Sequence, residues 1–199
     1  MHAANGYLLD QFLQDGTNQR TDRYGGTPVN RARLLREVTA AVIEVCGADR
    51  VGVRLSPINP TNGSHDSDPA ATYGQAAADL DRLGVVYLHV VEPGVNGTLS
   101  QPAPMSSQHL GSRFFRPLFS RTIIAASGLT ARSGTARIEN GDADLVAYGK
   151  PYISNPDLPE RFAAGAELTE PDQATFYFGG AEGYTDYPTL DRALTARAA

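Results

Sequence analysis

The chain has 199 residues, of which 41% are hydrophobic and 20% charged, and its formal net charge is −5 at pH 7. An acidic chain is a poor match for nucleic acid or an anionic membrane surface, since both favour basic proteins. A single cysteine, Cys46, excludes a disulfide framework and a thiolate metal cluster. The sequence has no apolar run of bilayer length and no signal-peptide pattern at its start, so we expect a cytoplasmic protein with one domain over 1–199.

Helices and short apolar strands alternate along the sequence. We expect a helix where a capping residue precedes proline and an apolar stripe follows at helical spacing, and a strand where a short apolar run ends in polar residues or glycine. In chain order, the expected elements are a helix over 27–47, a strand over 50–57, a helix over 68–84, a strand over 85–91, a loop over about 92–112, a strand over 121–128, a helix over 131–140, a strand over 143–149, a helix that starts at Asn155-Pro156, and a last helix from Thr189.

This alternation predicts an α/β fold with parallel strands and right-handed crossovers. The run VVYLHVV at 85–91 is apolar enough for a strand that is buried on both faces. The four expected strands end in polar residues or glycine, at Arg54, Glu92, Ser127-Gly128 and Gly149-Lys150. In a (β/α)8 barrel the carboxyl ends of the strands carry the chemistry, and an open doubly wound sheet follows a similar rule. Four such units would form half of a barrel.

Five segments, in order along the chain, resemble the old yellow enzyme family of FMN-dependent oxidoreductases. They are HAANGYLLDQFLQDGTNQRTDRYGG, RVGVRLSP, YLHVVEP, ADLVAYGKPYISNPDLPERF and TFYFGGAEGYTDYP. The resemblance implies a TIM barrel, of which this chain would be the C-terminal half, with about the last four βα units and a C-terminal helix. It also implies FMN as cofactor, NADH or NADPH as reductant, and an enone or another activated alkene as the small-molecule substrate.

The first quoted segment contains the candidate catalytic residues His2, Asn5 and Tyr7. Two hydrogen-bond donors on a carbonyl oxygen stabilise the negative charge that builds there when hydride attacks the conjugated double bond. The resemblance implies that His2 and Asn5 are these donors and bind the substrate, and that Tyr7 gives the proton to the neighbouring carbon. Without it, an ordinary His and Asn and a Tyr that packs in the core remain open alternatives.

The expected cofactor residues lie at the ends of later strands. Arg54 needs an anionic or polar partner there, and the resemblance implies contact with the flavin, while a structural salt bridge is the alternative. Ser127-Gly128 and Gly149-Lys150 would hold the FMN phosphate through backbone N–H groups and a cation. Lys150 stands where the family usually has arginine, so we expect weaker FMN binding, since lysine lacks the bidentate fork.

Two further aromatic residues match a loop that lines the cavity in the family. The resemblance implies that Phe176 contacts the flavin and that Tyr177 contacts the substrate, although aromatic residues of this kind are more often plain core. His89, inside a strand, is interpreted as a core or rim histidine with a satisfied hydrogen bond, and no metal ligands are expected.

The resemblance covers only the second half of the family's barrel. No strand is expected before His2, so the segment with His2, Asn5 and Tyr7 would extend from a free terminus. Because a half-barrel would leave sheet edges unpaired, we expect self-association or a complementing N-terminal half. The alternative function is a truncated, non-catalytic fragment that is active only when complemented.

Overall fold

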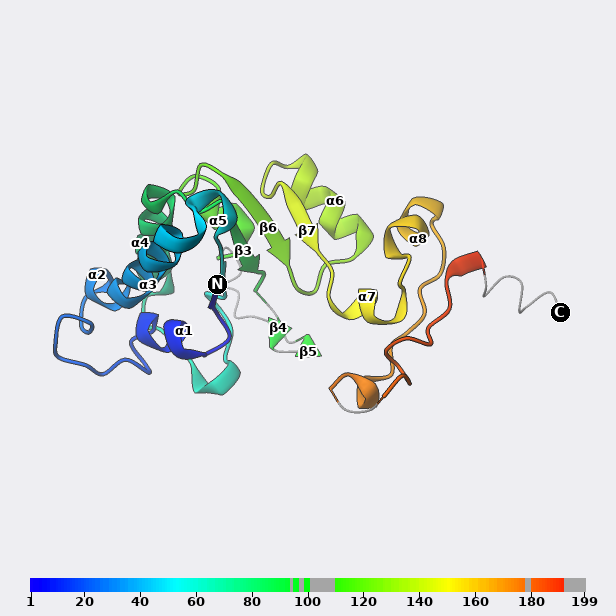
Figure 1. The fold of residues 1–199 in the computed structure, drawn as a ribbon, viewed down its shortest axis with the longest axis horizontal. Coiled ribbons are helices and arrows are strands. Elements are labelled where there is room, and N and C mark those ends of the chain that lie inside the picture. The colour runs from blue at the N-terminus through cyan, green and yellow to red at the C-terminus, as the bar shows by residue number, and fades with distance from the viewer. Residues whose placement is uncertain (94, 97–98, 101–109, 178–179, 192–199) are drawn as a thin grey trace. The chain divides into compact units, whose positions relative to one another are not determined.

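The computed structural model describes residues 1–93, 95–96, 99–100, 110–177 and 180–191 (Figure 1). The chain divides into two compact units, Met1–Ala147 and Tyr148–Ala199. The expectation of a single domain over 1–199 stays a prediction.

The first unit is built on a five-stranded parallel sheet in the order β1-β2-β3-β6-β7. Its strands are β1 (His2–Ala3), β2 (Gly52–Leu55), β3 (Tyr87–Val91), β6 (Thr122–Ala126) and β7 (Leu145–Ala147). Four of them lie inside the predicted strands. The fifth, β1, was not expected: His2 and Ala3 pair with Arg54 and Leu55 of β2. The prediction that no strand holds this segment is therefore wrong.

Helices follow the strands, as the alternation predicted. The helices of the first unit are α1 (Leu8–Leu13), α2 (Pro28–Arg31), α3 (Arg33–Cys46), α4 (Pro69–Leu83), α5 (Ser112–Phe115) and α6 (Ala131–Glu139), with 3-10 turns η1 (Ala48–Arg50) and η2 (Thr61–Gly63). The predicted caps are confirmed, since the side chains of Thr27 and Asp68 accept hydrogen bonds from backbone N–H groups in the first turns of α2 and α4. The helix expected over 27–47 is two helices, α2 and α3, which meet at Ala32.

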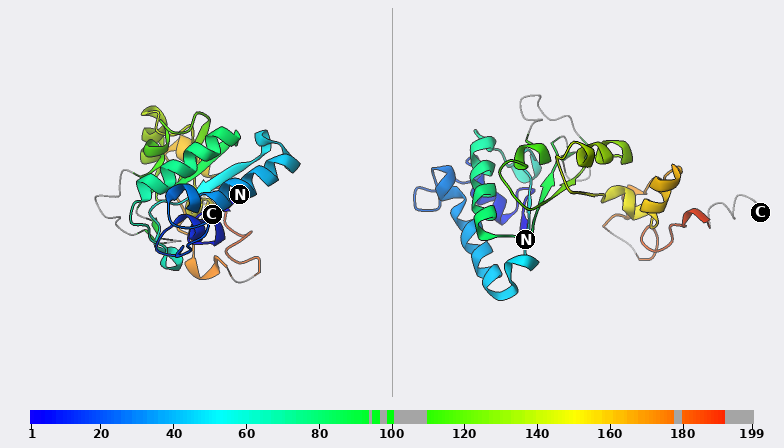
Figure 2. Two further views of the ribbon diagram at one scale, coloured as in Figure 1. Left: turned by 90° about the vertical axis from the view of Figure 1, so that its left-hand side faces the viewer. Right: turned by 90° about the horizontal axis from the view of Figure 1, so that it is seen from above.

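The core of this unit lies on one face of the sheet. Val53, Leu88 and Ile123, on three neighbouring strands, are fully buried in a cluster that also contains Tyr73 and Leu80 of α4. Helices α3 and α4 lie side by side (Figure 2). Burial alternates over the first four residues of β3 and of β6, where the intervening side chains are half-buried, while Val91 and Ala126 at the last positions are buried.

This alternation corrects one prediction about the strand at 85–91. Tyr87 and His89 are half-buried, whereas Leu88 and Val90 are fully buried. The strand is therefore not buried on both faces, because the apolar cluster lies against only one of them. Beyond β3, two short strands, β4 (Val95–Asn96) and β5 (Leu99–Ser100), pair antiparallel within the predicted loop of 92–112.

The second unit contains α7 (Lys150–Ser154), α8 (Leu158–Ala164) and the 3-10 turn η4 (Gln173–Thr175). The helix predicted from Asn155-Pro156 begins at Leu158, with Asp157 at the N-cap position. Asn155 has another role, because its Nδ2 donates to the carbonyl of Pro151 and its Oδ1 accepts from the N–H of Thr169. Of the helix expected from Thr189, only its first residues fall within the described part of the chain.

Candidate active site

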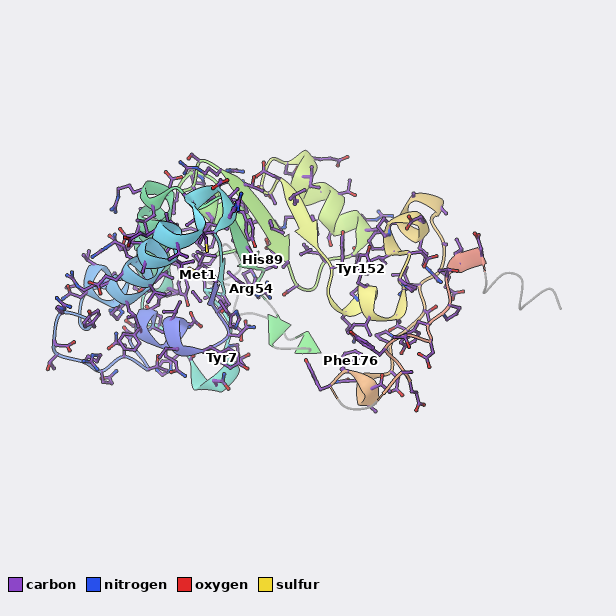
Figure 3. The ribbon with its side chains drawn as sticks, viewed as in Figure 1. Met1, Tyr7, Arg54, His89, Tyr152 and Phe176 are labelled. Carbon is purple, nitrogen blue, oxygen red and sulfur yellow. The ribbon has the colours of Figure 1, made fainter. Side chains whose placement is uncertain are left out.

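Three polar side chains form a row across neighbouring strands of the first unit. His2 on β1 is in register with Arg54 on β2, and Arg54 is in register with His89 on β3. Residues in register on parallel neighbours project from the same face, so the row lies on the face away from the apolar cluster, where Arg54 and His89 are half-buried and His2 is exposed. Figure 3 shows Arg54 and His89 close together. The next residue of the row, Ile124 on β6, is apolar.

Arg54 and His89 are hydrogen-bonded, with 2.7 Å between Nη1 and Nε2. A guanidinium only donates, so Nε2 accepts and the imidazole is neutral, with its proton on Nδ1. Burial, and then the charge of Arg54, lower the pKa of His89 to about 4. The interpretation of His89 as a satisfied histidine is confirmed, and the polar partner that Arg54 required is identified.

Arg54 has no carboxylate partner among the described residues. The structural salt bridge that the sequence left open is therefore absent from the described part of the chain. Burial lowers the pKa of Arg54, as expected when a cation loses water without gaining an anion. A half-buried cation with only a neutral partner is suited to an electron-rich or anionic ligand.

The turn after β1 has a left-handed backbone at two successive residues. Asn5 has a φ of 58° and Gly6 a φ of 70°. The N–H of Asn5 donates to Ser56 Oγ at 2.7 Å, and the N–H of Gly6 donates to Asp10 Oδ2 at 2.8 Å. A Cβ at Gly6 would collide with the carbonyl oxygen of Thr61, so glycine is needed for both conformation and space.

A fully buried polar network supports this turn. The hydroxyl of Tyr73 donates to Asp10 Oδ1, and Gln14 Nε2 donates to Asp10 Oδ2 at 3.0 Å. Burial raises the pKa of Asp10, and it also raises the pKa of Tyr73. Sequence reasoning missed Asp10. Its signal is an acidic residue that interrupts an apolar run, in the segment LLDQFL.

The turn brings the predicted catalytic residues together. The rings of His2 and Tyr7 lie 5.2 Å apart between centroids, with 51° between their planes. Burial, and then the charge of Arg54, lower the pKa of His2, which favours a neutral imidazole with one N–H donor. Tyr7 is 56% exposed, so it is not the core residue that the sequence left as an alternative. Asn5 lies between these two residues in the sequence, and its side chain is half-buried.

The segment before the turn is held by the sheet. The N–H of Arg54 donates to the carbonyl of Met1 at 3.0 Å, and Ala3 and Ala4 are fully buried. The expectation that His2, Asn5 and Tyr7 extend from a free end is therefore wrong, because His2 belongs to β1, which pairs with β2, and Asn5 and Tyr7 follow that strand.

The predicted phosphate residues fall into both units. Ser127 and Gly128 follow β6 in the first unit and have φ values of 81° and 67°. Gly149 and Lys150 belong to the second unit, where Lys150 is the first residue of α7. Ser127 and Gly128 directly follow their strand, as expected, whereas Gly149 and Lys150 open α7, a helix that the sequence did not predict. The joint phosphate site stays a prediction.

The aromatic pair also belongs to the second unit. The rings of Phe176 and Tyr177 lie 6.3 Å apart between centroids, at 83° to one another. Phe176 is half-buried and Tyr177 is 76% exposed, so Tyr177 is not a core residue of its own unit. Their contacts with flavin and substrate stay predictions.

The described residues contain no candidate membrane span and no candidate metal site. Their helices include none that is both long and apolar enough to span a membrane. In the same part of the chain, no three His, Cys, Asp or Glu side chains gather in a way that could hold a metal ion.

A parallel sheet with polar side chains near the carboxyl ends of its strands fits part of a (β/α)8 enzyme barrel and fits an open doubly wound sheet as well. A model of the NADH:flavin oxidoreductase / NADH oxidase family matches residues 1–169, and the chain belongs to this family. Membership implies FMN as the cofactor and an NADH-type reductant. The predicted resemblance to old yellow enzymes and the partial-barrel fold are confirmed by the relatives described next.

Three relatives show the extent of the similarity. 12-oxophytodienoate reductase 2 of Arabidopsis thaliana is 41% identical over 192 residues, which cover 96% of this chain and 50% of the relative. Morphinone reductase, also solved in complex with tetrahydroNAD, matches with a TM-score of 0.87 and 46% identity over 96% of this chain and 50% of its own. The old yellow enzyme homologue from Zymomonas mobilis has a TM-score of 0.87 and 40% identity, over 95% and 52%. The chain thus spans about half the length of these relatives.

Proposed function

We propose that the chain forms part of an FMN-dependent NAD(P)H oxidoreductase that reduces the C=C bond of α,β-unsaturated carbonyl compounds. One observation carries the proposal: Asn5 and Tyr7 lie on the anchored turn that follows β1, and His2 of β1 is in register with Arg54, a cation without a carboxylate partner in the described chain. The names of the relatives support it, since all three are reductases or old yellow enzymes.

His2 and Asn5 bind the substrate in this proposal. A neutral imidazole N–H and an amide N–H donate to the carbonyl oxygen, where negative charge develops during reduction. The lowered pKa of His2 suits this role, because the ring stays neutral at pH 7 and leaves the charge of Arg54 for another partner. Tyr177 is proposed as a further substrate contact, from the second unit.

Tyr7 is the proposed general acid. A phenol that lies beside the carbonyl donors can give a proton to the carbon next to the carbonyl. Its ring lies against that of His2, and its backbone N–H donates to the carbonyl of Ala4 at 3.2 Å, so its position follows from the turn. Its 56% exposed side chain is open to a ligand.

Bound FMN in its reduced form would supply the hydride for such a reduction, and NADH or NADPH would return the FMN to the reduced form. Arg54 fits the electron-rich edge of the flavin, because its half-buried charge has only the neutral imidazole of His89 as a hydrogen-bond partner in the described chain. Ser127, Gly128, Gly149 and Lys150 are the proposed phosphate residues, and Phe176 the proposed flavin contact. The tetrahydroNAD complex of morphinone reductase supports a nicotinamide reductant.

The test compares the chain with its Tyr7→Phe variant. We expect the purified chain to take up FMN, seen as visible absorbance, and to reduce 2-cyclohexenone with NADPH or NADH. Tyr7→Phe should slow the oxidation of reduced protein by cyclohexenone more than tenfold, while reduction by NADPH is unchanged. Tyr184→Phe, in the second unit and 81% exposed, is the matched control. If the purified chain takes up no FMN, the proposal that it reduces cyclohexenone without a further chain is contradicted.

A second candidate is a chain that acts only when complemented. It is favoured by the coverage, since about half the length of each relative has no counterpart here. The row of His2, Arg54 and His89, in which His2 is exposed and the other two side chains are half-buried, would then become enclosed on association. FMN uptake that requires an added N-terminal half of a relative, or that coincides with dimer formation, would favour this candidate.

A further inference from the structure

Asn59 lies in the segment after β2 and contacts the turn after β1. The backbone N–H of Thr61 donates to Asn59 Oδ1 at 2.9 Å, and Asn59 Nδ2 donates to Asn5 Oδ1 at 3.1 Å. Asn59 is only 5% exposed. The side chain therefore forms a buried link between a backbone donor and the amide of Asn5.

The direction of these bonds follows from the first donor. The oxygen and nitrogen of an amide are similar in shape, so its orientation is set by its hydrogen-bond partners. A backbone N–H can only donate, which turns the oxygen of Asn59 toward Thr61 and its NH2 toward Asn5. Asn5 must then accept through Oδ1, and its own NH2 faces away from Asn59.

The rest of Asn5 is held separately. Its backbone N–H donates to Ser56 Oγ at 2.7 Å, and its carbonyl accepts from Asn62 Nδ2 at 3.1 Å. These bonds fix the backbone and leave the side-chain amide free to present either its oxygen or its NH2. Within the described residues, the contact with Asn59 alone distinguishes the two orientations. The Asn5 NH2 has no hydrogen-bond partner within the described residues.

We propose that Asn59 is a positioning residue that fixes the Asn5 amide so that it presents its NH2, and not its oxygen, to the substrate. The inference rests on the proposed function, in which Asn5 donates to a carbonyl oxygen. The opposite orientation would place an amide oxygen against the substrate oxygen, which is repulsive. The preference of the site for a substrate with a carbonyl oxygen would then depend on a residue that does not contact the substrate.

Asn59→Asp tests this proposal because it reverses the direction of the link, and the negative charge that it adds can be reproduced in a control variant. The carboxylate still accepts from the Thr61 N–H, but it cannot donate to Asn5, so the Asn5 amide turns its NH2 toward residue 59. With FMN-loaded protein, we expect the dissociation constant of the ketone cyclohexanone to rise about tenfold, the size of one lost hydrogen bond, with FMN content unchanged. Asn30→Asp, which adds the same charge on α2, should leave this constant unchanged.

A double variant separates positioning from a general structural effect. If Asn59 acts through Asn5, then Asn59→Asp should cause no further loss in the Asn5→Ala background. An additional tenfold loss there would overturn the proposal, because Asn59 would act by another route. If the two substitutions have additive effects on ketone binding in a double variant that folds normally, the proposal is overturned in the same way.

A measurement that needs neither FMN nor substrate tests the orientation itself. In the free chain, side-chain amide NMR signals assigned through Asn5→Ala should show faster proton exchange for the NH2 of Asn5 than for that of Asn59. In Asn59→Asp the Asn5 protons should become protected. Protected Asn5 protons in the wild type would overturn the inference. If the chain shows the expected exchange but binds no FMN or ketone, the proposed function fails and the orientation stands.

Discussion

Two turns at the carboxyl edge of the sheet share one backbone conformation and differ in what surrounds them. Asn5-Gly6 after β1 and Ser127-Gly128 after β6 each have two successive residues with positive φ. Side chains from Ser56, Asp10 and Asn59 bind the first turn. No side-chain hydrogen bond reaches Ser127 or Gly128 within the described residues.

The difference matches the proposed tasks of the two turns. A turn that carries reacting groups must hold their geometry closely, so its own backbone groups are used by the protein. A turn that receives a phosphate needs backbone N–H groups that are open to the ligand. The strands that precede the two turns also differ. The polar row near the first turn contains Arg54 and His89, whereas the residue of β6 in register with them is the apolar Ile124.

The largest effect is expected where the first turn is supported. Asp10→Ala removes the acceptor of the Gly6 N–H, the Tyr73 hydroxyl and the Gln14 amide, all of them buried. The free energy of unfolding should fall by about 3–5 kcal/mol, because three donors lose a partner without access to water. Urea unfolding measures it. The control is Asp22→Asn, at an exposed residue whose side chain bonds to Arg20 and to the backbone of Tyr24, and it should change the free energy of unfolding little. A small loss in Asp10→Ala would mean that the turn is not supported in this way.

A glycine pair separates collision from backbone strain. Gly6 and Gly26 both have positive φ, but a Cβ at Gly6 would collide with Thr61, whereas at Gly26 it would meet nothing within 4 Å. Gly26→Ala should cost about 1 kcal/mol of unfolding free energy, and Gly6→Ala about 2–4 kcal/mol. Equal losses in thermal or urea unfolding would show that the first turn is no more closely packed than a surface turn.

The row below the first turn predicts a pH dependence. The pKa of His89 is about 4 in the folded chain and 6.5 in the unfolded one. As the pH falls from 7 toward 4, the unfolded chain binds the proton first, so stability falls through this window. The pKa of His2 is lowered too, so His2 also makes the folded chain less stable as the pH falls. Arg54 is the charged group that faces His89 from β2, and Ile124 on β6 is neutral.

His89→Gln isolates this contribution. Glutamine can accept from Arg54 but does not titrate, so the variant should lose less stability than the wild type between pH 7 and pH 4. The expected difference is about 1–2 kcal/mol, reduced from the full shift because His89 is partly exposed. Parallel urea curves at several pH values measure it, and identical pH profiles would count against a neutral His89 bonded to Arg54.

The smallest effect is expected in the second turn. Ser127 has a φ of 81°, which is unfavourable for any residue with a Cβ, and no side-chain bond offsets the strain in the described chain. Ser127→Gly should therefore raise the unfolding free energy by up to about 1 kcal/mol. Asn5→Gly, at a similar φ, should lower it, because the bond from Asn59 is lost. If Ser127→Gly and Asn5→Gly change the free energy of unfolding in the same direction, the two turns do not differ in side-chain support.

Local patterns predicted most of the elements of the first unit. The caps Thr27 and Asp68, the stop at Gly84 and the four longer strands depend on short-range rules, and they are where the sequence placed them. The two-residue strand β1 was missed because no apolar run is long enough to indicate it. The start of α8 was missed because Asn155 bonds to Thr169, fourteen residues away, instead of capping the helix.

The candidate site was predicted as a set of residues and not as an arrangement. The sequence by itself determined the family, the turn residues His2, Asn5 and Tyr7, and the need of Arg54 for a partner, because these depend on residue type and spacing. Only the tertiary structure decided that His89 is that partner, that Asp10 supports the turn and that Asn59 donates to Asn5. Those contacts join residues from different strands and loops, and their direction depends on which donor meets which acceptor in space.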